Sequence, residues 1–333
     1  MTQPIRIGLL GASRIAPAAI IEPTTGRDDF VVTAIAARSS ERAAQFAREH
    51  RIETVFANYA DLTSAANVDL VYNALPPAGH LEWTLAALAA GKHVLCEKPF
   101  AMNANEARVM VAVADDSRGA LLEAFHYRFH PLFDRLLKQV RATEFGNIQR
   151  FDAHFNVAIP FVEGELRHVF ELGGGALMDL GCYPLHWART VFGFEPRIES
   201  AKATEGAPGI DLSMHAVLDF DGIEARISCD MSETVAPGAS AQLCVYGENQ
   251  TVTVENPIAP HHGHQLIVEA GDRKEAVSVP GRSTYSHQLD HVAEVIAGEA
   301  TALTGGADAV ANMQAIDRIY TAAGLQPRTS LHD

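Results

Sequence analysis

The chain has little positive charge and no long apolar run. Its 333 residues carry 26 Lys and Arg against 41 Asp and Glu, which gives a formal net charge of −15. Such a balance repels nucleic acids, and no run of Lys or Arg offsets it locally. The longest apolar stretches, such as 83–90, are too short for a membrane-spanning helix. With 47% hydrophobic and 20% charged residues, the composition predicts a globular protein, and the length suggests two domains of about 150 residues each.

Cysteine is also scarce, and no CxxC spacing occurs. The pattern indicates neither a disulfide framework nor a zinc knuckle. The first seven residues lack the charged and apolar segments of a signal peptide, so we expect a cytoplasmic protein. No tyrosine has a lysine four residues later, which removes the main support for a short-chain dehydrogenase. We interpret the four cysteines as buried small hydrophobic residues: Cys96, Cys182, Cys229 and Cys244.

The first part of the chain alternates short apolar runs with stretches of helical periodicity. This alternation indicates βαβ units and therefore a doubly wound parallel sheet. The expected strands are 5–10, 31–37, 69–75, 93–97 and 120–125, and the expected helices are 40–50, 80–90 and 103–116.

Beyond a bridging helix at 131–142, the pattern changes to longer alternating strands. Two turn signals, Asp221-Gly222 and Gly247-Glu248-Asn249, predict hairpins and hence a mostly antiparallel sheet. We place one domain boundary near residue 125. The expected strands are 149–159, 198–204, 212–220, 223–231, 242–246 and 251–255, and the closing helices are 285–297 and 308–323.

The segment after the first strand resembles a degraded dinucleotide fingerprint. In Gly11-Ala12-Ser13-Arg14-Ile15-Ala16 only the first glycine remains, Ser13 replaces the second, and Ala16 stands at the third. The end of the second strand adds evidence on the cofactor. It carries Arg38 and Ser39, with Arg42 one turn later, and no carboxylate that would repel a 2′-phosphate. The pattern favours NADP(H) over NAD(H).

Two further segments contain groups suited to a reaction centre. Lys98 ends a parallel strand, at the sheet edge where open α/β folds bind ligands, and Pro99 favours an unusual peptide geometry there. In the glycine-rich segment 173–187, a helix would place Asp179, Tyr183 and His186 on one face. Tyr183 could then take the proton that an alcohol loses on oxidation, if the Lys98 ammonium lies near enough to favour the phenolate.

These residues resemble the glucose-fructose oxidoreductase/inositol dehydrogenase (Gfo/Idh/MocA) family over nearly the whole chain. The resemblance rests on GASRIA (11–16), on Ala74-Leu75-Pro76-Pro77 with His80, on GKHVLCEKP (91–99), on EAFHYRFHP (123–131) and on GGGALMDLGCYP (173–184). It implies a Rossmann domain over 1–125, followed over 126–333 by an α+β domain with a large open, mostly antiparallel sheet. It also implies NAD(P)-dependent chemistry on sugars, polyols or diols.

The resemblance further implies roles for individual residues. Lys98 would contact cofactor and substrate, Asp179 would bind substrate hydroxyls, and Tyr183 would be the proton donor or acceptor. Tyr183 is typical of the branch with glucose-fructose oxidoreductase, dihydrodiol dehydrogenases and NADP-dependent xylose dehydrogenases, in which His126 often has an apolar counterpart. The expected cofactor contacts are Gly11, Ser13, Arg14, Ile15, Arg38, Ser39, Arg42, Leu75, Pro76, His80, Glu97 and Lys98. The expected substrate contacts are Lys98, His168, Asp179, Tyr183 and His186.

Two function classes remain open from the sequence. One is an NADP-dependent oxidoreductase of a small sugar or cyclic polyol, and the other is a cofactor-binding sensor or scaffold without turnover. Retention of Lys98, Asp179 and Tyr183 together favours the enzyme. We expect no metal at His261, His262 and His264, because no carboxylate or cysteine accompanies them. An open sheet that exposes one face, together with the resemblance, predicts a homodimer or a larger homo-oligomer.

Overall fold

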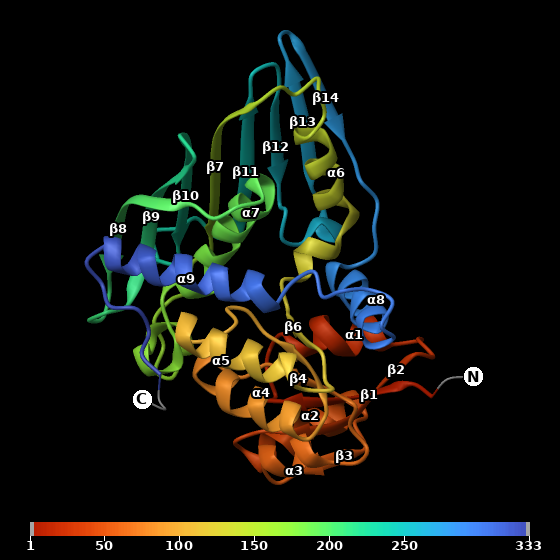
Figure 1. Cartoon of the computed structure of the whole chain (residues 1–333). Coiled ribbons are helices and arrows are strands. Elements are labelled where there is room, and N and C mark those ends of the chain that lie inside the picture. Colours follow the sequence, from red (N-terminus) through yellow and green to blue (C-terminus); the bar gives the residue numbers. More distant parts are fainter. Residues whose placement is uncertain (1–2, 331–333) are drawn as a thin grey trace. The chain divides into compact units, whose positions relative to one another are not determined.

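The structure, a computed structural model, describes residues 3–330, which form two units (Figure 1). The first unit comprises residues 3–125 and 285–310, and the second comprises residues 126–284 and 311–330. The chain leaves the first unit between Phe125 and His126, at the boundary that the sequence indicates. It then returns for 285–310, whereas the sequence suggests one continuous second domain. The return has a packing reason, because Leu289 and Val292 belong to the apolar core of the first unit.

The first unit contains a six-stranded parallel sheet with the order β3-β2-β1-β4-β5-β6. This order confirms the predicted doubly wound fold. Strand β3 and helix α3 were not predicted, because a three-residue strand and a six-residue helix give almost no periodic signal. The strands are β1 Ile5–Leu10, β2 Phe30–Ala36, β3 Thr54–Phe56, β4 Leu70–Asn73, β5 His93–Cys96 and β6 Leu121–Glu123. The helices include α1 Glu22–Thr24, α2 Ser40–His50, α3 Tyr59–Ser64, α4 His80–Ala89, α5 Ala104–Asp115 and α8 Thr284–Ile296.

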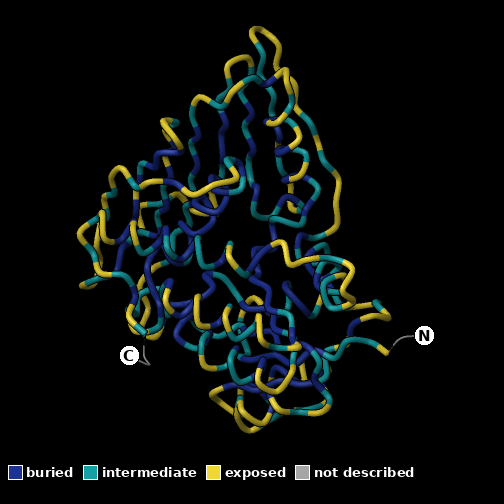
Figure 2. The backbone as a smooth tube through the Cα atoms, in the orientation of Figure 1, coloured by how far each residue is buried: buried dark blue, intermediate teal, exposed yellow. Residues whose placement is uncertain are grey.

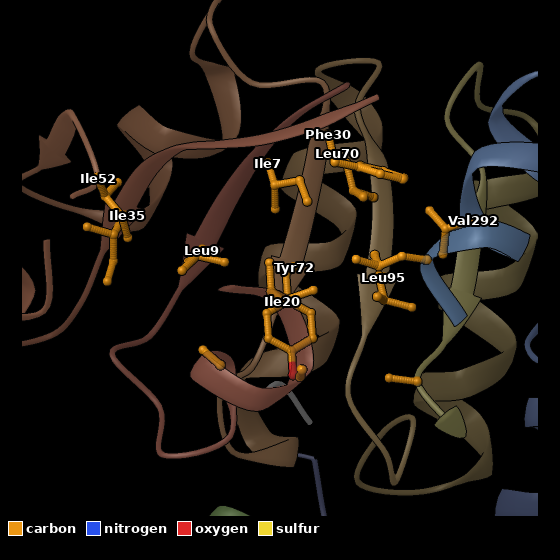
Figure 3. Packing of buried hydrophobic residues seen from close by; sticks show 14 of the residues in the cluster. Ile7, Leu9, Ile20, Phe30, Ile35, Ile52, Leu70, Tyr72, Leu95 and Val292 are labelled. Carbon is orange, nitrogen blue, oxygen red and sulfur yellow. The ribbon is translucent and has the colours of Figure 1, made fainter. Parts of the chain in front are cut away.

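The core of the first unit forms around the central strands. The backbone in the interior of this unit is coloured as buried in Figure 2. Apolar side chains of β1 and β4, such as Ile7, Leu9 and Leu70, are buried and pack in this core (Figure 3). Parallel strands covered on both faces are expected to read as continuous apolar runs, which is how the sequence revealed them.

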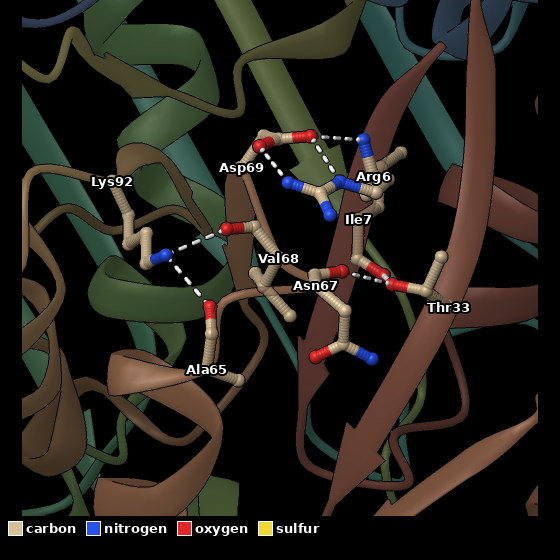
Figure 4. Close-up of polar contacts among 8 residues, drawn as sticks. All are labelled: Arg6, Ile7, Thr33, Ala65, Asn67, Val68, Asp69 and Lys92. Atoms are coloured by element: carbon tan, nitrogen blue, oxygen red, sulfur yellow. Dashed lines mark hydrogen bonds and ion pairs between the residues drawn. The ribbon is translucent and has the colours of Figure 1, made fainter. Parts of the chain in front are cut away.

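Polar contacts fix the amino ends of the same strands (Figure 4). Arg6 in β1 donates to the carboxylate of Asp69, just before β4, through Nη2 at 2.7 Å, Nε at 2.8 Å and its backbone N–H at 3.0 Å. Lys92, just before β5, donates from Nζ to the carbonyl oxygens of Ala65 and Val68 at 2.7 and 2.8 Å. These anchors occupy the amino edge, while the loops at the carboxyl edge contain the predicted ligand residues.

The second unit contains an eight-stranded sheet with the order β14-β13-β12-β11-β7-β10-β9-β8. Only the β7 and β10 pair is parallel among the described strands, which confirms a mostly antiparallel sheet. Strands β13 and β14 were not predicted, because β14 is largely exposed and charged. The strands are β7 Ile148–Asn156, β8 Arg197–Glu205, β9 Asp211–Phe220, β10 Ile223–Asp230, β11 Ser240–Gly247, β12 Thr251–Glu255, β13 Gln265–Ala270 and β14 Arg273–Val277.

The two faces of this sheet differ. Along β7, Phe151, Ala153 and Phe155 are buried, and the helical segment Leu177–Phe192 packs against this strand and β10. The alternate residues of the strands line an open hollow of about 580 Å³ whose walls include Asp152, His154, Lys202, His215, Arg226 and Tyr246. The unit also contains helices α6 Pro131–Val140, α7 Cys182–Phe192 and most of α9 Gly306–Ala322.

No helix within residues 3–330 is both long enough and apolar enough to cross a lipid bilayer.

Candidate active site

The turn after β1 has the backbone geometry of a nucleotide-binding turn. Gly11 has φ +92°, which favours glycine, and a Cβ there would lie 3.3 Å from Leu75 Cδ2. Ser13 turns inward, and its Oγ accepts a hydrogen bond from the Ala16 backbone N–H at 3.2 Å. Strand β1 lies between β2 and β4, at the point where the strand order reverses. Open α/β sheets bind dinucleotides at this switch point, so the residues present fit such a cofactor.

The turn after β2 presents positive charge at the same edge of the sheet. Arg38 and Arg42 are exposed, and Arg42 donates from Nη2 to the carbonyl oxygen of Ala12 at 3.2 Å. Ser39 caps helix α2 by accepting from the Arg42 backbone N–H at 3.2 Å, which leaves its hydroxyl proton available to a ligand. Burial raises the pKa of Tyr59, whereas hydrogen bonding to the Arg38 backbone and the charges of Arg38 and Arg42 oppose that shift. Tyr59 is a neighbour of this cationic turn that the sequence analysis did not single out.

His80, a predicted cofactor contact, lies among three backbone carbonyl groups. It is fully buried, its Nδ1 lies 3.1 Å from the carbonyl oxygens of both Pro99 and Phe100, and its Nε2 lies 2.9 Å from the carbonyl oxygen of Leu75. Burial lowers the pKa of His80 to about 4. Because both ring nitrogens face backbone carbonyls, the ring is placed to hold the loops after β4 and β5 together. The role of His80 as a cofactor contact stays a prediction.

Glu97 and Lys98 follow β5 at this edge. The Glu97 carboxylate accepts from the Tyr72 hydroxyl at 2.6 Å and from the Lys98 backbone N–H at 3.2 Å. Burial, followed by the negative charge of Glu97, raises the pKa of Tyr285 in the same unit. The Lys98–Pro99 peptide bond is cis, as the Pro99 signal suggested.

In the second unit, the predicted glycine-entered helix has two parts. Leu177–Gly181 forms a π-helix, which continues as α7. The backbone N–H of Cys182 bonds back to the carbonyl oxygen of Leu177, five residues earlier, and Pro184 supplies no N–H to the next turn. The spacing argument for one regular helical face is therefore wrong in detail, and the predicted polar side chains have different partners.

Asp179 is held by an arginine that the sequence analysis missed. Arg167 Nε donates to Asp179 Oδ2 at 2.6 Å, and Arg167 Nη1 donates to Glu165 Oε1 at 2.8 Å. Burial acts to lower the pKa of Arg167, but Asp179 and Glu165 outweigh it and raise the pKa. Asp179 thus belongs to a cluster with Arg167 and Glu165. In such a cluster the carboxylates can accept, and the guanidinium can donate, hydrogen bonds to a hydroxylated ligand.

Tyr183 and His186 belong to two tyrosine and histidine pairs. The Tyr183 hydroxyl lies 3.4 Å from His126 Nε2, and the Tyr127 hydroxyl lies 2.5 Å from His186 Nδ1. All four residues are buried. His168, the remaining predicted substrate contact, has its Nε2 2.9 Å from the carbonyl oxygen of Ile159.

A buried ion pair holds the glycine run that precedes Asp179. Asp211 Oδ1 accepts from Arg328 Nη2 and from the Tyr320 hydroxyl, each at 2.9 Å, while Asp211 Oδ2 accepts from the Leu177 backbone N–H at 2.7 Å. Arg328 Nε donates to the carbonyl oxygen of Gly174 at 2.6 Å. Burial raises the pKa of Asp211, although Arg328 and the hydrogen bonds oppose the shift. The π-helix therefore begins on a rigid buried support.

The histidine cluster of the second unit is engaged in local contacts. His261 Nδ1 accepts from the Thr284 backbone N–H at 3.4 Å, and His264 Nε2 accepts from the Val279 backbone N–H at 3.0 Å. Within the described residues, no group of three or more His, Cys, Asp or Glu side chains is arranged to hold a metal ion.

Both units match known sequence profiles. Residues 5–125 match the oxidoreductase family with an NAD-binding Rossmann fold, and residues 133–253 match the Gfo/Idh/MocA C-terminal domain. The chain belongs to the Gfo/Idh/MocA family. The predicted fold class, family and enzyme class, an oxidoreductase that uses a nicotinamide dinucleotide, are therefore confirmed.

Similar proteins within this family include two named for NADP(+). D-xylose 1-dehydrogenase (NADP(+)) 2 of Haloferax volcanii is 30% identical over 319 residues, 95% of this chain and 96% of the relative. The scyllo-inositol 2-dehydrogenase (NADP(+)) of Bacillus subtilis is 31% identical over 284 residues, 83% of each chain. A crystal structure of a 3-ketoreductase from Actinomadura kijaniata with NADP and TDP-benzene matches with a TM-score of 0.86 and 25% identity, over 96% of this chain and 98% of that chain.

Proposed function

We propose that this Gfo/Idh/MocA protein transfers a hydride between NADP(H) and a hydroxyl-bearing or keto carbon of a sugar, cyclic polyol or diol. Family membership supports the oxidoreductase class, and the two relatives named above support NADP and a sugar-type substrate. The observation that carries the proposal is the placement of Gly11, Arg38 and Ser39 at the carboxyl edge of a doubly wound sheet.

The first unit binds the cofactor in this proposal. The turn from Gly11 to Ile15 presents backbone N–H groups to the pyrophosphate. Arg38, Ser39 and Arg42 bind the 2′-phosphate, because a guanidinium pairs with a phosphate through charge-assisted hydrogen bonds. When bound, NADP supplies the hydride acceptor or donor of the reaction.

The second unit supplies the groups that hold the substrate and move its proton. Asp179, oriented by Arg167, accepts hydrogen bonds from substrate hydroxyls. Tyr183 removes the hydroxyl proton during oxidation and returns it during reduction. Lys98 contacts the cofactor and the substrate in this proposal. His168 and His186 complete the proposed substrate contacts.

The proposal also covers the oligomeric state of the protein and its location in the cell. The open sheet face with the hollow between Asp152 and Lys202 presents apolar and polar groups together, and we propose that a second copy of the chain covers it in a homodimer or larger homo-oligomer. A monomeric mass by light scattering at micromolar concentration would refute this assembly. We also propose a cytoplasmic location.

A direct assay tests the function. NADP reduction is followed optically with D-xylose, scyllo-inositol and trans-1,2-dihydrobenzene-1,2-diol. NADPH oxidation is followed with the lactone of D-xylose and the ketone of scyllo-inositol. Tyr183→Phe keeps the ring and deletes the proton-transferring group, so turnover should fall by about 10² to 10⁴ while NADP affinity persists. Tyr320→Phe is the matched control, because it removes a buried phenol hydroxyl that bonds Asp211 rather than a proposed substrate contact. NADP binding without turnover of any panel member would favour the sensor, and wild-type turnover in folded Tyr183→Phe would remove Tyr183 from the proposed role.

A further inference from the structure

A histidine lies against the tyrosine that we assign as acid/base. His126 Nε2 is 3.4 Å from the Tyr183 hydroxyl, and His126 Nδ1 is 2.8 Å from Oγ1 of Thr284. His126 is 5% exposed and Thr284 is 0% exposed. Each ring nitrogen of His126 therefore has a hydroxyl group beside it in a buried setting.

Hydroxyl groups on both sides allow two hydrogen-bond directions. In one, Tyr183 donates to Nε2 while Nδ1–H donates to Thr284. In the other, Thr284 donates to Nδ1 while Nε2–H donates to the oxygen of Tyr183. The first direction suits a neutral phenol, and the second suits a phenolate. An apolar side chain or an amide at position 126 has no ring nitrogen that gains or loses a proton. It could therefore not switch between these two hydrogen-bond directions.

We propose that His126 is a proton relay for Tyr183, an inference that rests on the proposed oxidoreductase function. During oxidation the substrate O–H bond breaks and its proton passes to the Tyr183 oxygen, as the Tyr183 proton passes to His126 Nε2. The substrate C–H bond breaks with its electron pair, which leaves as a hydride to NADP+, and a C=O bond forms. His126 becomes an imidazolium with Nδ1–H directed to Thr284. The positive charge lost by the nicotinamide thus reappears on His126, and in reduction each transfer is reversed.

The neighbouring pair shows why contact alone does not define a relay. His186 Nδ1 is closer to a phenol, at 2.5 Å from Tyr127, but Tyr127 is not the assigned acid/base. Titratable groups near His126 and Tyr183 include Tyr127, whose ring centroid lies 6.0 Å from that of Tyr183, and His261, which accepts from the Thr284 backbone N–H. His126 acts through Tyr183 and is a positioning and relay residue rather than a catalytic one.

Substitution of His126 separates proton transfer from packing. His126→Gln keeps hydrogen-bonding capacity without a titrating ring, and His126→Leu removes both properties. In both variants kcat for the best panel substrate should fall by about 10- to 100-fold, with KM and NADP affinity unchanged. His93→Asn is the control, because His93 in the first unit is a half-buried histidine that accepts from the Ala120 backbone N–H. It should keep wild-type kcat.

Chemical rescue and solvent isotope effects identify the proton step. Added imidazole should restore turnover in His126→Gly, and the rescue should follow the pKa of substituted imidazoles. The dependence of the wild-type rate on deuterium content of the solvent should be curved, which indicates more than one proton in transfer, and it should become linear in His126→Gln. Wild-type kcat in His126→Gln, or rescue independent of the pKa of the added base, would overturn the relay.

The experiments distinguish an incorrect relay from an incorrect oxidoreductase assignment. If Tyr183→Phe abolishes turnover while His126→Gln does not lower it, the oxidoreductase assignment stands and the relay is wrong. If Tyr183→Phe keeps wild-type turnover, the assigned acid/base is wrong and the relay falls with it. Should His126→Leu fail to fold, the curved isotope dependence of the wild-type enzyme and its loss in His126→Gln decide the question.

Discussion

The two units present their functional residues in opposite surroundings. In the first unit, Arg38, Ser39 and Arg42 are exposed in the turn after β2 and the start of α2, where Ser39 and Arg42 make contacts with the backbone. In the second, Tyr183 and His126 are 4% and 5% exposed and bond to each other. Binding a phosphate needs charge at a ligand-facing edge, whereas a proton transfer needs groups whose orientation and desolvation are fixed in advance.

This difference predicts unequal tolerance to substitution. Exposed charges are screened by water, so the loss of one changes ligand affinity with little effect on the fold. Buried polar groups depend on one another, because an unpaired partner keeps its desolvation cost. We therefore expect the largest effects in the second unit and the smallest at exposed ion pairs.

The largest stability effect should come from the buried ion pair. Asp211 and Arg328 have fully buried side chains, and Asp211→Asn leaves the guanidinium buried without its carboxylate. The free energy of unfolding should fall by about 3–5 kcal/mol, measured by urea unfolding. Asp219→Asn is the control in the same sheet, because its partner Arg197 is exposed, and it should lower the free energy of unfolding much less. Equal losses in the two variants would contradict the comparison.

A second effect concerns the substrate. Asp179→Asn removes the charge that Arg167 orients, so KM for the sugar should rise by about 10- to 100-fold through loss of a charge-assisted hydrogen bond, with a smaller change in kcat. Steady-state kinetics measure both parameters. Glu165→Gln alters the other partner of Arg167 and should raise KM less. A lower kcat at constant KM would instead place Asp179 in the proton step.

Substitution of the exposed residues in the first unit should change the affinity for the cofactor rather than the free energy of unfolding. Arg38→Ala should weaken NADP binding by about 1–3 kcal/mol and spare NAD, because only the 2′-phosphate loses its partner. Calorimetric titration with both cofactors measures the difference. Arg48→Ala, near the end of α2, removes another exposed arginine and should change neither affinity. Equal affinity of the unmutated protein for NADP and NAD would rule out the proposed selectivity.

The smallest effect is expected at the amino edge of the parallel sheet. The hydrogen bond from Arg6 lowers the pKa of Asp69, although burial opposes the shift, and both side chains are more than a third exposed. Asp69→Asn should therefore cost less than about 1 kcal/mol at neutral pH. Because the folded pKa is depressed, the contribution exists above the unfolded pKa of about 3.9 and disappears as pH falls through the folded value. Urea unfolding at neutral and acidic pH should show the two proteins converging in acid.

Local sequence signals revealed most of the first unit. Apolar strands alternating with helices revealed the parallel sheet, and Gly11 and Arg38 could be placed because motif residues lie at fixed offsets from strand ends. The return of α8 to this unit could not be predicted, because it depends on Leu289 and Val292 packing against strands more than a hundred residues earlier.

The second unit needed the tertiary structure. The sequence alone identified Asp179, Tyr183 and His186 as candidate polar groups within one segment. It did not reveal the change from π-helix to α-helix, nor that Arg167 bonds Asp179 or that His126 lies against Tyr183. Those pairings join residues from different segments of the chain. Helical periodicity describes neighbours within one segment, whereas burial and side-chain packing decide which distant hydroxyl, carboxylate or ring nitrogen each of these groups meets.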